Sequence, residues 1–264
     1  MSTKKTFATA QSKLATPTTN LPCECCVPTP DPVGRAADRA SFPHEGPWPS
    51  ARRNLMVSKA AEERLGSLFG PLEGVVHETR SWLIYVEVHL RGAVPEKDYP
   101  FVDLHTAGMS QRPMHNPEGR RQGLPLHAEL TMRFPDAWCE GESLLKTISR
   151  PEKRWPVLWL RALARLPHER KSFLERGHVV TFPEGEYEGC PFNGALMADA
   201  LWNDDMAVGP YIREDMAAVE LLQVVPLLPT ETAFAQRNCV DHLVKRLEAA
   251  EAHETVRLDR EPVI

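Results

Sequence analysis

The sequence predicts an α+β fold, in which helices pack on a mixed, mostly antiparallel sheet. Apolar and polar residues alternate strictly from Leu126 to Phe134, which is the period of a half-buried strand. Apolar residues recur at i, i+3, i+4 and i+7 from Trp155 to Leu166, which is the period of an amphipathic helix. The order of the elements, with helices before, between and after groups of strands, completes the prediction.

The first half of the chain is expected to hold a helix and three strands. The helix has an apolar face at i, i+4, i+7 and i+8 and is stopped by a Gly-Pro pair, and each strand alternates with a period of two. The predicted elements are helix 58–69 with Ser58 as its cap, strand 82–90, strand 102–107 broken at Gly108, a polar loop through Pro113 to Pro125, and strand 126–134.

The second half is expected to add two helices and at least two strands. Pro167 is predicted to end the helix that starts at Trp155, because proline cannot donate the helical hydrogen bond. Residues 218–228 are apolar on both faces, which is typical of a central strand. The other elements are a short strand at 177–182, an apolar run of undecided type at 193–201, a last helix capped by Thr230 with its apolar face at 240–247, and an edge strand at 256–258.

Composition divides the chain into an arm and a body. Residues 1–53 hold eight of the 24 prolines and show no periodicity, so we expect a disordered or extended arm, followed by a folded domain over 54–264. Residues 1–54 carry seven Lys/Arg and four Asp/Glu, a net charge of +3, whereas the rest carries 24 against 32, a net charge of −8. An acidic body disfavours nucleic acid and favours a basic partner. Moderate net charge also serves solubility alone.

The sequence shows no signal peptide and no apolar window long enough to cross a membrane, so a cytoplasmic protein is expected. Three of its six cysteines, Cys23, Cys25 and Cys26, lie within four residues. Zinc accepts thiolates, but a structural site needs four ligands and usually two spaced pairs. His44 is the nearest candidate for a fourth ligand. The alternative is a reduced, exposed cluster in the arm.

Polar residues on the strand from 126 to 134 are predicted to form a wet face of the sheet, next to the polar loop. Two kinds of enzyme site are conceivable there. Asp103, His105 and Ser110 suggest a hydrolase, but Ser110 lacks the G-x-S-x-G turn that exposes a nucleophile. His127 and Glu129, on one face of their strand, suggest a metal site with His105 as a candidate third ligand. The alternative to both is a polar surface that contacts a partner.

The sequence over roughly 55–262 resembles a known family, the suppressor of fused domain family. The resemblance is to its bacterial, single-domain members. It depends on the order and spacing of several segments, which are Thr106–Met114, Ala128–Pro135, Trp155-Pro156 with Leu163–Glu169, Gly177-His178, and Leu222–Leu227 with Glu231.

The resemblance implies a mixed α/β domain with no known catalytic residue. Animal members of the family sequester a transcription factor by gripping a peptide as an added strand, and bacterial members look like immunity proteins of polymorphic toxin systems. In the animal relatives an acidic residue of the partner cleft matches Glu129. The second lobe of those relatives has no counterpart here, and the cysteine cluster is not part of the family pattern.

We therefore expect a non-enzymatic protein-binding domain, acting as an immunity protein that neutralises a cognate toxin, without a cofactor. The expected alternatives are a metal-dependent or serine hydrolase using the His105/Ser110 or His127/Glu129 surface, and an accessory domain that docks through its cysteine-rich arm. The expected partner is a toxin domain encoded nearby. The residues expected to contact it are His105, Ser110, Arg112, His127, Glu129 and Thr131.

Overall fold

The computed structural model describes residues 65–66, 69–77, 84–93, 100–116, 126–202, 206–207, 211–212 and 218–264. The predicted arm over 1–53, with Cys23, Cys25 and Cys26, lies outside the described residues, as does the predicted cap Ser58.

Within the described residues, the molecule is built on a sheet of eight strands in the order β1-β2-β3-β4-β10-β6-β5, with β9 also paired to β10. Only β10 and β4 run parallel, and the other neighbours run antiparallel. This confirms the α+β prediction. The strands are β1 Leu72–Val76, β2 Glu87–Arg91, β3 Phe101–Ala107, β4 His127–Pro135, β5 Val179–Thr181, β6 Gly194–Asp199, β9 Tyr211–Ile212 and β10 Ala218–Leu227, and a separate pair joins β7 Leu201–Trp202 to β8 Met206–Ala207.

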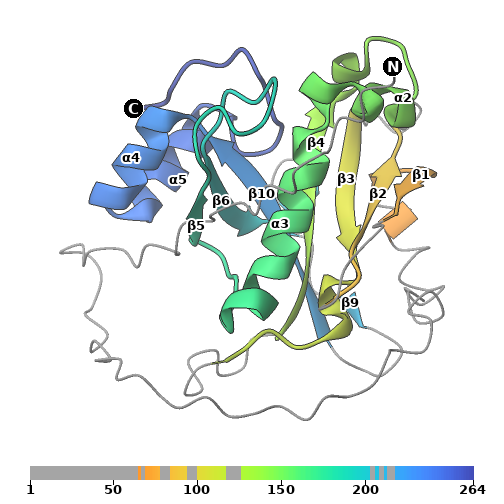
Figure 1. Cartoon of the computed structure of the whole chain (residues 1–264). Helices are drawn as coiled ribbons and strands as arrows, with labels where there is room; N and C mark the ends of the chain where they lie inside the picture. The colour runs from red at the N-terminus through yellow and green to blue at the C-terminus, as the bar shows by residue number, and fades with distance from the viewer. Residues whose placement is uncertain are drawn as a thin grey trace, which may run out of the picture.

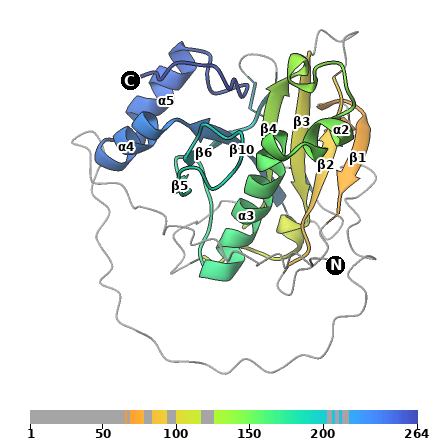
Figure 2. The same ribbon diagram turned by 45° about the horizontal axis from the view of Figure 1, so that its top comes forward.

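Helices cover both ends of the sheet (Figures 1 and 2). The long helix α3 crosses one face, α2 lies near the β1 end, and α4 and α5 lie beside the β5–β6 end. Their bounds are α2 Leu144–Ser149, α3 Trp155–Arg170, α4 Pro229–Arg237 and α5 Val240–Ala249. None of the described helices is long and apolar enough to cross a membrane.

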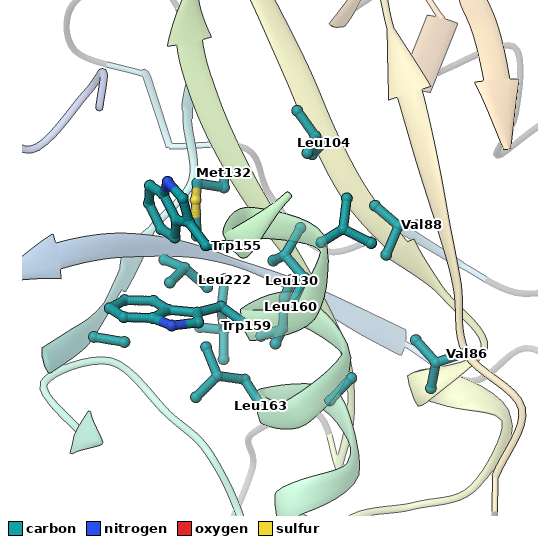
Figure 3. Close-up of a cluster of buried hydrophobic side chains, with 14 of the residues drawn as sticks. Val86, Val88, Leu104, Leu130, Met132, Trp155, Trp159, Leu160, Leu163 and Leu222 are labelled. Carbon is teal, nitrogen blue, oxygen red and sulfur yellow. The ribbon is translucent and has the colours of Figure 1, made fainter. Parts of the chain in front are cut away.

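The main core lies between α3 and the sheet (Figure 3). Its largest members are the fully buried Trp155 and Trp159, whose ring centroids lie 5.1 Å apart. Trp159 also stacks on Phe182, with centroids 4.1 Å apart. They pack with aliphatic residues of α3 and of the strands that it crosses, namely Leu104, Leu130, Met132, Leu160, Leu163 and Leu222. The apolar period of α3 is therefore the direct cause of its position.

Several predicted details of the elements are wrong, and the single last helix expected after Thr230 is two helices, α4 and α5. Pro167 lies inside α3, which continues to Arg170 and ends where Lys171 adopts a positive φ of 51°. Thr230 is not the cap of α4, because the helix begins at Pro229 and the Glu231 carboxylate accepts the Leu228 N–H. Residues 256–258 form no strand, since only a single bond from the Val256 N–H to the Arg133 carbonyl connects them to β4.

The predicted wet face of the sheet is also wrong, because both faces are covered. Glu129, Thr131 and Arg133 of β4 are 3%, 2% and 5% exposed. Phe69 and Gly70 lie on this second face: the Arg133 guanidinium lies 5.9 Å from the Phe69 ring, and Arg91 donates to the Gly70 carbonyl at 3.0 Å. The polar residues of the face form a buried layer instead of a solvated surface.

Candidate functional site

The Gly108–His115 loop is anchored to β4 by hydrogen bonds to one carboxylate, that of Glu129. Its two oxygens accept four hydrogen bonds: from the Thr106 hydroxyl at 2.6 Å, from the Gly108 N–H at 2.9 Å, and from the Ser110 N–H and hydroxyl at 3.0 and 2.7 Å. Burial raises the pKa of this carboxyl, and the four hydrogen bonds oppose that rise. Four donors on one acceptor group fix the shape of the loop.

The backbone of the loop is shaped for this contact. Gly108 has a φ of 118°, a conformation that residues with a Cβ rarely adopt, and it directs its N–H at Glu129. The His127 ring lies against the far side of the turn, with Nδ1 2.7 Å from the Ser110 carbonyl oxygen. Alternation along β4 therefore aims His127 and Glu129 at the same loop, as neighbours on one face of the strand.

The other end of the loop is pinned by Met114 and His115. Met114 is 2% exposed, its N–H donates to the Leu126 carbonyl at 2.7 Å, and its sulfur accepts the Leu174 N–H at 3.4 Å. The His115 N–H donates to the Ser172 carbonyl at 3.1 Å, just beyond the end of α3. The loop is thus fixed at both ends, and its middle faces outward.

The outward part of the loop carries the accessible side chains of the site. Pro113 and His115 are exposed, and Arg112 and His127 are partly exposed. His168, near the end of α3, lies close to this group. Burial lowers the pKa of His168, a hydrogen bond with the Met109 backbone opposes the shift, and the charges of Arg112 and His127 lower the pKa further. The result is a firm corner of the molecule that carries the Arg112 guanidinium.

His105 and Thr131 are not part of that corner, although the sequence groups them with it. They lie in the buried polar layer, where His89, His105, Thr131 and Gln223 are register neighbours on four adjacent strands. His105 is 1% exposed and, among the described residues, neither of its ring nitrogens has a hydrogen-bond partner. Burial and the nearby charges of Arg91 and His89 hold the pKa of His105 well below its usual value.

The arrangement gives little support to the two enzyme sites considered from the sequence. The Ser110 hydroxyl donates to Glu129, and the His127 ring contacts the Ser110 carbonyl rather than the hydroxyl. Glu129 is surrounded by donors, so its oxygens are not presented to a metal. Across the described ranges, no three His, Cys, Asp or Glu residues gather into a group that could hold a metal ion.

The sequence groups Ser110, Arg112, His127 and Glu129, and hydrogen bonds connect Ser110 to Glu129 and to His127 in the structure. The supporting roles of Thr106 and Gly108 and the presence of His168 were not predicted. Gly108 was the available signal in the sequence, since a glycine after a strand often marks a required positive φ. No local signal in the sequence connects His168 to the loop.

One family accounts for the similar proteins described below. The profile of the suppressor of fused protein family (SUFU) matches residues 83–261. No curated protein matches the chain. Sufu in the crystal structure of the Sufu–Fu complex has 18% identity and a TM-score of 0.51, covering 78% of this chain and 91% of that chain.

Two further solved structures belong to the same group. A putative SUFU homologue from Neisseria gonorrhoeae has 14% identity and a TM-score of 0.52, covering 76% of this chain and 93% of that chain. Drosophila Suppressor of Fused has 19% identity and a TM-score of 0.45, covering 69% of this chain and 43% of that chain. The two structures with a TM-score above 0.5 show a shared fold, and the profile match extends over more than half of the sequence. The chain belongs to the suppressor of fused protein family.

Proposed function

We propose that this protein is a non-catalytic protein-binding domain that acts as an immunity protein, neutralising a toxin encoded nearby. The observation that carries the proposal is the Gly108–His115 loop, which is fixed at both ends while its middle is accessible. A loop already held in one shape loses little conformational entropy on binding, and this favours affinity. Sufu in the Sufu–Fu complex is a relative that binds a protein.

Burial divides the predicted contact residues into two roles. Arg112 and His127, with Pro113 and His115, are accessible enough to touch a partner. Ser110 and Glu129 are buried, so in this proposal they position the loop and do not touch the partner. Arg112 is the proposed centre of the contact, because a guanidinium forms paired hydrogen bonds with a carboxylate. His105 and Thr131 support the sheet below.

A hydrolase is a weaker proposal. The Ser110 hydroxyl shares one carboxylate with two backbone N–H groups and the Thr106 hydroxyl, which is the arrangement of a structural anchor. An accessory domain that docks through residues 1–53 remains an alternative. Removal of those residues separates it from the immunity proposal, which needs only the folded domain.

Co-expression with the product of the adjoining gene tests the proposed function. That product is expected to arrest growth alone, and the wild-type protein is expected to restore growth. Arg112→Glu should fail to restore it, whereas Arg237→Glu, the same charge change at an exposed position on α4, should restore it fully. Growth arrest that persists with the wild-type protein, or rescue by Arg112→Glu as complete as by Arg237→Glu, would contradict the proposal.

A further inference from the structure

A pocket separate from the Gly108–His115 loop is lined by residues of β6 and α5. Figure 2 shows α4 and α5 on the side of the sheet that ends in β6 and β5. The pocket has a volume of about 420 Å³, including its open mouth. Leu196 and Ala198 of β6 and Val244 and Leu247 of α5 line it with apolar groups. This volume counts open solvent at the mouth, so the enclosed space is smaller than that of drug-sized ligand pockets and suits a single side chain.

The rim of the pocket is polar and carries a negative excess. Arg176 and Asp199 form an ion pair at 2.8 Å, so their charges offset each other. Glu248 of α5, on the opposite wall, leaves one formal negative charge. The chain beyond residue 54 has a net charge of −8, which adds a longer-range attraction for a basic partner.

His253 gives the pocket a further polar group that is held in place. Its backbone carbonyl accepts a hydrogen bond from Gln223 Nε2 at 2.8 Å, and its Nε2 lies 3.8 Å from the Glu254 carboxylate. Within the described part of the chain, its Nδ1 is buried without a hydrogen-bond partner. A buried ring nitrogen without a partner gains a hydrogen bond when a polar ligand group reaches it. A peptide group next to an inserted side chain supplies such a group.

We infer that this pocket binds one aliphatic or aromatic side chain of a partner protein, taken from a segment in which a lysine or arginine lies next to that side chain. The apolar wall holds the side chain, Glu248 pairs with the neighbouring cation, and His253 meets the backbone. The inference rests on the proposed function only in taking the ligand to be a protein. It adds a second contact, with a different chemistry, between β6 and α5.

The probe for this site is the capped dipeptide acetyl-Leu-Lys-amide, added at millimolar concentration to the full chain with ¹³C-labelled methyl groups. The NMR signals of Leu196, Val244 and Leu247 should shift and saturate. Acetyl-Leu-Glu-amide should bind about fivefold more weakly, because an exposed ion pair contributes up to about 1 kcal/mol. Acetyl-Gly-Lys-amide should cause no saturating shift. Shifts that do not saturate, or that saturate equally for all three probes, would overturn the inference.

Variants of the pocket give an independent readout. Glu248→Lys should reverse the preference between the Lys and Glu probes, whereas Glu169→Lys, the same charge change at an exposed site on α3, should leave it unchanged. Ala198→Phe should fill the pocket and abolish binding. Val244→Gln, which changes polarity with little change in volume, should weaken binding and serves as the test if Ala198→Phe does not fold. Binding of acetyl-Leu-Lys-amide that is unchanged in both Glu248→Lys and Val244→Gln would contradict the site.

Because the probes need no cognate toxin, a failure here leaves the immunity proposal intact. Conversely, if the protein gives no protection against the adjoining gene product, saturating shifts at these three residues would still support the pocket.

Discussion

The effect of a single buried residue on stability depends on whether its polar atoms have hydrogen-bond partners. Glu129 is 3% exposed and accepts four hydrogen bonds, so all the polar atoms that meet at it are satisfied. His105 is 1% exposed and, in the described part of the chain, has two ring nitrogens without partners. A buried polar atom without a partner destabilises the fold, whereas one with good partners specifies it. The two residues should therefore respond to substitution in opposite directions.

Glu129→Ala should destabilise the protein by about 3 kcal/mol, because it leaves several buried donors of the loop without an acceptor. Urea unfolding at pH 7 measures the loss. Glu169→Ala, which removes an exposed glutamate at the end of α3, should change stability by less than about 0.5 kcal/mol. Equal stabilities of the two variants would mean that Glu129 does not anchor the loop.

His105→Phe should stabilise the protein by about 1 kcal/mol at pH 7, because a ring of similar shape removes two unsatisfied polar atoms. The advantage should grow in acid. The pKa of His105 is below 6.5 in the folded state, so the unfolded chain binds its proton first and stability is lost as pH falls below about 6.5. The difference in stability between the variant and the wild type should therefore widen from pH 7 to pH 5.

Unfolding free energies at pH 7 and pH 5 test this difference. Glu129, whose raised pKa gives a slope of the opposite sign, is common to both proteins and cancels in the comparison. His242→Phe, at an exposed position of α5, should follow the wild-type pH dependence. If His105→Phe loses stability in acid as steeply as the wild type, His105 is not buried in its neutral form.

Elements of this fold are positioned by packing on both faces of the sheet, which limits what local patterns can predict. The apolar period of α3 and the doubly apolar sequence of β10 predict correctly that one packs on the sheet and the other lies centrally. Alternation along β4 predicts its side-chain directions, but not that Phe69, far away in sequence, covers the polar face. Thr230 fails as a predicted cap because Glu231 takes that role, with Arg260 as its distant partner.

The start of α4 also shows how the C-terminal segment is attached. Glu231 is fully buried and accepts bonds from Arg260 at 2.5 and 2.6 Å and from the Val263 N–H at 3.1 Å. Arg260 also donates to the Pro226 carbonyl at 3.0 Å. One carboxylate thus connects the helix start to the end of the chain.

Arg260→Leu should destabilise the protein by about 3–5 kcal/mol, because it leaves the Glu231 charge buried without its cation. The double variant Glu231→Gln/Arg260→Leu should recover part of this loss, since it removes the uncompensated charge. Arg257→Leu, at an exposed position three residues earlier, should have little effect. Thermal unfolding of the four proteins gives the comparison, and a double variant less stable than Arg260→Leu would contradict the account.

The whole molecule combines a folded sheet, a fixed loop that carries Arg112, and a pocket between β6 and α5 with a negative rim. The sequence predicts the family, the fold class and the grouping of Ser110, Arg112, His127 and Glu129. It does not predict which of these are accessible, because exposure depends on Phe69 and on the end of α3, which approach from distant parts of the chain. The pocket between β6 and α5 is likewise absent from any local pattern, since its walls are distant in sequence.

We propose that residues 54–264 fold and function without the preceding segment, so deletion of residues 1–53 should leave the unfolding midpoint within about 2 °C. Protection in the co-expression assay should also survive the deletion. Removal of zinc from the full chain with a chelator should have no effect on binding, because Cys23, Cys25 and Cys26 lie in the deleted segment. Loss of protection on deletion would instead favour the accessory-domain alternative.

The central claim is that the fixed loop around Arg112 binds a protein. Calorimetric titration of the purified adjoining gene product into wild type, Arg112→Glu and Arg237→Glu tests it most directly. We predict that Arg112→Glu raises the dissociation constant by about 30-fold or more, as expected for a residue that contributes about 2 kcal/mol to binding. Arg237→Glu should change the dissociation constant by less than about threefold. A wild-type protein that does not bind, or an Arg112→Glu variant that binds as tightly as wild type, would contradict the claim.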